Sequence, residues 1–104
     1  MRLRRAPFRD VVARQLDLFV QDEADLLEEC RDKYRLYKQA DREDTEEAYG
    51  DFVDAVETAT EALADMRDRF GRTLDADAAE EYEDSFNRAV RRRWPELGLE
   101  IDLR

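Results

Sequence analysis

A heptad repeat runs without interruption through the middle of this chain. Its apolar positions recur at alternating steps of three and four residues, and they are Tyr49, Phe52, Val56, Ala59, Leu63, Met66 and Phe70. This spacing places every member on one side of an α-helix, where the row can pack against neighbouring helices. The repeat therefore predicts an all-α protein with a central helix over residues 45–70.

The residues before the repeat carry a second apolar stripe at helical spacing. It consists of Phe8, Val12, Leu16, Phe19, Val20, Leu27, Cys30, Tyr34 and Tyr37. Pro7 suits the first position of a helix, so we expect one continuous helix over residues 7–40. A short polar link at residues 41–44 makes this helix and the central helix antiparallel neighbours.

A third helix is expected over residues 76–94, where Tyr82, Phe86 and Val90 share one face and Pro95 ends the helix. With 104 residues the chain has room for one hydrophobic core, so residues 1–104 form a single helical domain. The sequence thus predicts a three-helix bundle built on a long antiparallel helical hairpin.

The C-terminal segment, residues 95–104, shows a different pattern. Apolar and polar residues alternate there, and the apolar ones are Leu97, Leu99, Ile101 and Leu103. A period of two predicts a short extended tail, which packs on the bundle or across a dimer, or docks on a protein partner. The last eight residues resemble the C-terminal peptides that load cargo into encapsulin shells, but their spacing differs and we take no function from the likeness.

Composition argues against catalysis. The chain has no histidine, one cysteine and one serine, Ser85, so it lacks a base to activate a nucleophile and lacks the ligands for a zinc site. We expect no enzyme activity, no cofactor and no dedicated metal site. Clusters of carboxylates leave a carboxylate-based metal-binding protein as an alternative.

The same composition bears on location. A lone cysteine, Cys30, favours a reducing compartment, and we expect the cytoplasm. No apolar run approaches the roughly 20 residues that cross a bilayer, so we expect a soluble protein with no membrane contact.

Charge is distributed unevenly along the chain. The net charge is −10, yet arginines gather at both ends: Arg2, Arg4, Arg5, Arg9 and Arg14 at the start, and Arg88, Arg91, Arg92 and Arg93 near the end. The second group suits the C-terminus of a helix and can neutralise acidic neighbours. Cations oppose the dipole at a helix start, so Arg4, Arg5 and Arg9 are the better candidates for a partner contact.

Nucleic acid is not expected as a partner, because the acidic middle of the chain repels a polyanion. A nucleic-acid-associated regulator remains an alternative that requires both arginine groups to share one face.

One residue conflicts with the first apolar stripe. Glu23 lies near its centre, and a buried carboxylate is costly without a partner. Pairing the helices outward from the link brings Glu23 near Thr60, with Arg67 one turn further along. We expect Glu23, Thr60 and Arg67 to form a buried polar group, or Glu23 to be partly exposed by a slight rotation of the helix. A ligand or metal role of Glu23 is the alternative.

Three apolar residues, Val11, Leu18 and Leu36, point away from the predicted hairpin. Together with the apolar tail they predict a homodimer. The expected function is a non-catalytic helical interaction or scaffold role, with self-association and a protein partner contacted through the tail.

Overall fold

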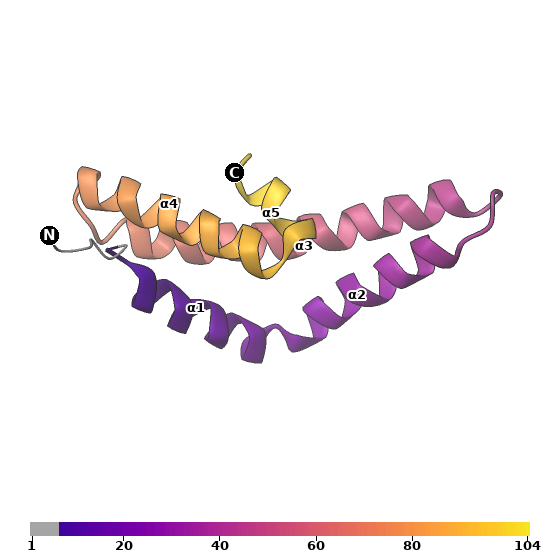
Figure 1. The fold of residues 1–104 in the computed structure, drawn as a ribbon, viewed down its shortest axis with the longest axis horizontal. Coiled ribbons are helices and arrows are strands. Elements are labelled where there is room, and N and C mark those ends of the chain that lie inside the picture. The colour runs from indigo at the N-terminus through magenta and orange to yellow at the C-terminus, as the bar shows by residue number, and fades with distance from the viewer. Residues whose placement is uncertain (1–6) are drawn as a thin grey trace, which may run out of the picture.

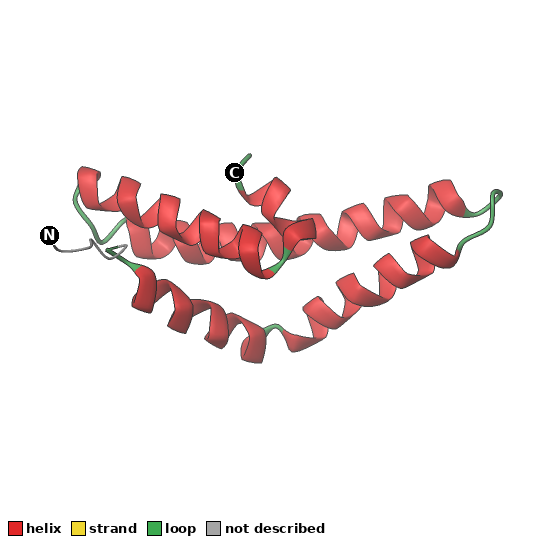
Figure 2. Cartoon of the chain, viewed as in Figure 1, coloured by secondary structure: helices red, strands yellow, loops and turns green. Residues whose placement is uncertain are grey.

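The computed structural model describes residues 7–104, and at Gly98 and Leu99 the backbone alone. This part of the chain forms five helices and no strand, which confirms the all-α class (Figure 2). The helices are α1 (Arg9–Asp22), α2 (Ala24–Gln39), α3 (Thr45–Gly71), α4 (Ala76–Arg93) and α5 (Pro95–Ile101).

Helix α3, which carries the heptad repeat, is the central helix of an elongated molecule about 56 Å long. In Figure 1, α2 lies along the N-terminal half of α3, and α4 lies along the C-terminal half of α3. Helix α1 packs on α4, and α5 packs on both α3 and α4. The heptad residues Val56, Ala59 and Leu63 are buried, so the repeat forms the centre of the core.

The predicted continuous helix over residues 7–40 is wrong, because the chain bends at Glu23 between α1 and α2. Glu23 has φ −116° and ψ 34°, although its N–H still donates to the Phe19 carbonyl at 2.8 Å. The bend occurs at the charged member of the apolar stripe. It leaves Glu23 half-buried rather than enclosed, and it lets α1 cover α4 while α2 covers α3.

The predicted extended tail is also wrong, because residues 95–101 form helix α5. Pro95 ends α4 and at the same time occupies the first position of α5, where its missing N–H costs nothing. Leu97 and Ile101 are four residues apart and so share one face of this helix. Both are buried, at 3% and 0% exposure, and anchor α5 to the core.

Candidate functional site

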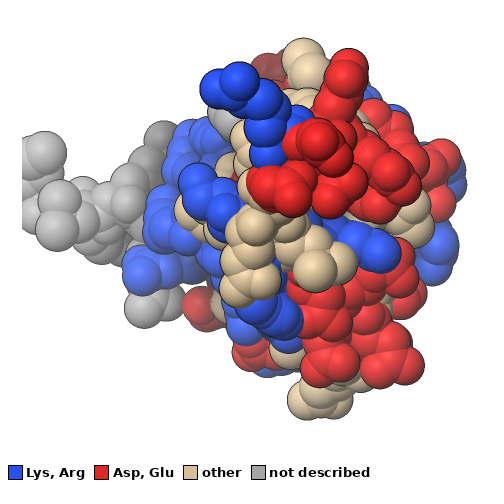
Figure 3. Space-filling view, turned by 90° about the vertical axis from the view of Figure 1, so that its right-hand side faces the viewer, with Lys and Arg blue, Asp and Glu red and all other residues tan. Residues whose placement is uncertain are grey.

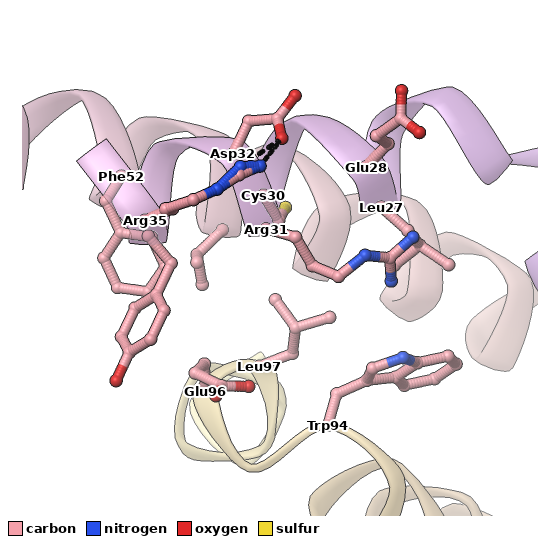
Figure 4. A pocket seen from close by; sticks show the side chains of 12 residues that line it. Leu27, Glu28, Cys30, Arg31, Asp32, Arg35, Phe52, Trp94, Glu96 and Leu97 are labelled. Atoms are coloured by element: carbon pink, nitrogen blue, oxygen red, sulfur yellow. Dashed lines mark hydrogen bonds and ion pairs between the residues drawn. The ribbon is translucent and has the colours of Figure 1, made fainter. Parts of the chain in front are cut away.

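A groove of about 580 Å³ lies between α2, the N-terminal half of α3 and the start of α5 (Figure 4). It is partly open to solvent, and its volume is within the range of ligand-binding clefts. The groove is lined by Leu27, Glu28, Cys30, Arg31, Asp32, Tyr34, Arg35, Phe52, Val56, Trp94, Glu96 and Leu97.

The floor of the groove is apolar and buried. Leu27, Cys30, Val56 and Leu97 line it, and each is at most 8% exposed. The Cys30 thiol donates to the Ala55 carbonyl at 3.4 Å. Burial, aided by the nearby Glu29 carboxylate, raises the pKa of that thiol, so Cys30 remains a protonated packing group rather than a nucleophile.

Aromatic side chains lie at both ends of the groove. Trp94 is half-buried and its ring centroid is 5.9 Å from that of Phe19. At the other end the Tyr34 and Phe52 centroids are 5.3 Å apart, and Tyr34 is 39% exposed. Flat apolar rings are therefore available to a bound molecule at each end.

The charged side chains on the rim differ in their pairing. Arg35 forms an ion pair with Asp32 one turn earlier in α2. Arg31 has no hydrogen bond or ion pair with any residue that the structure describes. Figure 4 shows its side chain extending from α2 into the space above Leu97 and Trp94. The guanidinium of the exposed Arg31 thus lies over the apolar floor without an ion pair, in a groove that Glu28 and Glu96 also line.

A second groove, of about 400 Å³, lies between α1 and α4. It is lined by Arg9, Val12, Ala13, Ser85, Arg88, Ala89 and Arg92. The fold therefore brings an arginine from the start of the chain next to two arginines from the group near its end.

The predicted interaction residues are dispersed by the fold. Arg4 and Arg5 lie outside the described residues, as does the side chain of Leu99. Leu97 and Ile101 are enclosed in the core. The others are at or near the surface: Arg9, Leu18, Leu36 and Leu103 are exposed, and Val11 is half-buried.

The predicted buried polar group is divided. Thr60 and Arg67 are in the core, but Arg67 has partners other than Glu23. Its guanidinium donates to Asp68 at 2.9 Å, to the side-chain oxygen of Asn87 at 2.9 Å and to the Ile101 carbonyl at 3.4 Å. The Thr60 hydroxyl donates within its own helix, to the Val56 carbonyl at 2.7 Å.

The groove at Trp94 was not predicted from the sequence. The residues that line it come from three helices. Arg31 and Glu96 are two of many charged residues in the sequence, so no pattern distinguishes them as site residues. The available signal was Pro95 directly after Trp94, since proline begins helices as readily as it follows them. Recognising α5 would have placed Trp94 at a helix junction.

Residues 7–104 contain neither a cluster of metal ligands nor a helix that could span a membrane. No group of three or more Cys, Asp or Glu side chains there is arranged to hold a metal ion. None of the helices described combines the length and apolar character that crossing a bilayer requires.

Comparison of the chain with protein-family models, with curated proteins and with solved structures gives no match. Inference about function therefore rests on the two grooves and the surface around them.

Proposed function

We propose that this protein is a non-catalytic interaction protein that binds a segment of a protein partner in the groove between α2 and α5. The observation that carries the proposal is Arg31, a guanidinium without an acidic partner above an apolar floor. The segment it fits has apolar side chains for the floor and an adjacent carboxylate for Arg31.

The composition of the groove favours a protein partner. Tryptophan, tyrosine and arginine are the residues that most often dominate binding energy at protein interfaces. Trp94, Tyr34 and Arg31 line one hollow, with buried Leu27 and Leu97 between them. A partly open groove between helices also suits a peptide segment, whereas small molecules are held in more enclosed cavities.

The test is a selection of random displayed peptides on the wild-type protein, followed by measurement of the affinity of the enriched peptides for Arg31→Glu. We expect enriched peptides that combine apolar residues with a nearby Asp or Glu. Their affinity should fall about tenfold or more on Arg31→Glu, a loss of about 1.4 kcal/mol. Arg42→Glu carries the same charge change at an exposed residue in the α2–α3 link and should bind as the wild type does. Equal binding to both variants would contradict the proposal.

Self-association is a second proposal. Leu18 on α1 and Leu36 on α2 are 49% and 55% exposed. We propose that these side chains contact a second copy of the chain.

A cytoplasmic location is a separate proposal. It is based on the single thiol of the chain, which suits a reducing compartment.

A further inference from the structure

The groove between α1 and α4 is lined by positive charges, although the protein as a whole is acidic. The chain holds 28 acidic residues and has a net charge of −10, yet none of the acidic residues that the structure describes lines this groove. Three arginines do: Arg9, Arg88 and Arg92. In the end-on view of Figure 3, Lys and Arg are more frequent on the left and Asp and Glu on the right, although some Lys and Arg lie among the acids.

Two neighbouring arginines of α4 are paired with acidic side chains of the same chain. Arg91 forms an ion pair with Asp102 at 2.6 Å, and Arg93 forms one with Asp17 at 2.9 Å. For Arg88 and Arg92 the structure gives no hydrogen bond or ion pair with a described residue. The expectation of intramolecular neutralisation therefore describes only half of this arginine group.

Arg9 adds a third positive charge where the helix itself disfavours one. It is the first residue of α1, and a cation at a helix N-terminus opposes the helix dipole. Three like charges around one hollow also repel each other. A bound anion would remove both costs, so the groove is suited to a negatively charged ligand.

We propose that the groove between α1 and α4 binds the phosphate backbone of a nucleic-acid duplex. Arg88 and Arg92 are one turn apart on α4, about 6 Å along its axis, so they can reach two successive phosphates of a strand. Guanidinium groups bind phosphate oxygens through two parallel hydrogen bonds. The Ser85 hydroxyl, one turn before Arg88, is a further donor.

The lining also sets the mode of contact. Among residues 7–104 no aromatic side chain lines the groove, so these residues offer no surface on which unpaired bases can stack. Binding through phosphates alone is independent of base sequence and is weakened by salt.

The test is fluorescence anisotropy with a short labelled DNA duplex at several salt concentrations between about 50 and 200 mM. We expect the wild type to bind with a log–log salt slope of about −2 to −3, because each phosphate contact contributes about −0.9. Arg88→Gln with Arg92→Gln should weaken binding about tenfold or more and bring the slope closer to zero by about 2.

The matched control is Arg42→Gln with Arg69→Gln, which removes the same charge from two exposed arginines that do not line the groove. This control should bind within about twofold of the wild type, and circular dichroism should show both double variants folded. Equal weakening of the two variants, or no binding by the wild type at the lowest salt, would overturn the proposal. So would polyglutamate that competes as well as unlabelled duplex at equal charge, since the groove would then prefer carboxylates.

Discussion

At the scale of single residues, Tyr82 links the fold to pH. Its side chain is fully buried, with its ring against Phe8, Phe70 and Phe86, and its hydroxyl donates to the Gln15 side-chain oxygen at 2.7 Å. Burial raises the pKa of this hydroxyl from 10.0 to about 12. The folded state therefore holds the Tyr82 proton more tightly than the unfolded chain does.

This shift predicts a loss of stability at alkaline pH. The contribution of Tyr82 is fully present below pH 10.0 and is lost as pH rises towards about 12, because only the unfolded chain ionises in that interval. The loss amounts to about 2–3 kcal/mol. Tyr82→Phe should be about 1 kcal/mol less stable than the wild type at neutral pH, having lost one hydrogen bond, and more stable than the wild type near pH 12.

Urea denaturation at a series of pH values measures this crossing. Tyr49→Phe is the control, because Tyr49 is 51% exposed and its variant should keep a constant gap to the wild type. A Tyr82→Phe gap that does not change with pH would refute the linkage.

At the scale of elements, Arg67 connects three helices through hydrogen bonds. It projects from α3, hydrogen-bonds Asn87 on α4 and reaches the carbonyl of Ile101 at the end of α5. Its side chain is 2% exposed and its charge is balanced by Asp68, which is itself half-exposed. Because α5 has only seven residues, it depends on such contacts rather than on its own propensity.

Removing the Arg67 guanidinium should therefore loosen α5. Arg67→Met leaves the Asn87 oxygen and the Ile101 carbonyl without this donor, and we expect a loss of about 2–4 kcal/mol in urea denaturation. Hydrogen exchange of residues 95–101 should accelerate more than that of α2. Arg69→Met, at an exposed position two residues away, should stay within about 0.5 kcal/mol of the wild type. Equal effects of the two substitutions would show that Arg67 does not hold α5.

The elements also show how far the sequence could be interpreted. The heptad repeat predicted a helix over residues 45–70, and α3 spans Thr45–Gly71 because its periodicity and its burial agree. The bend at Glu23 was missed because the apolar pattern of the sequence continues through it, whereas the packing of α1 on α4 that accompanies the bend joins residues far apart in the chain. Helix α5 was missed because Leu97 and Ile101 satisfy both a period of two and a spacing of four.

The candidate site was less predictable than the fold. Arg31, Cys30 and Trp94 meet only after α5 has folded back on α3, so no local pattern in the sequence brings them together. Arg9 was expected at a partner contact from its position at a helix start. Its approach to Arg88 and Arg92 depends on α1 packing against α4 and could not be derived from the sequence.

At the scale of the whole molecule, the exposed leucines predict self-association. Multi-angle light scattering at micromolar concentration should give twice the chain mass for the wild type. Leu18→Glu with Leu36→Glu should give the mass of one chain, because two charges would be placed in the contact. The control Gln21→Glu with Gln39→Glu adds the same charge at exposed polar positions on the same two helices and should remain dimeric. A wild type that is strictly monomeric would disprove the dimer.

The two proposed binding sites lie in separate grooves. The first has an apolar floor, with Arg31 on its rim, and the second is lined by three arginines and, among the described residues, by no aromatic side chain. They are on different helix pairs, α2 with α5 and α1 with α4, so variants in one groove should leave binding in the other unchanged.

The most direct test of the peptide groove uses the fluorescence of Trp94, the only tryptophan in the chain and a lining residue of that groove. Titration with a selected peptide should shift the Trp94 emission to shorter wavelength as the peptide excludes water from the indole, and Arg31→Glu should require about ten times more peptide for the same shift. Peptide binding that is detected by anisotropy but leaves the Trp94 emission unchanged would place the peptide elsewhere and contradict the proposed function.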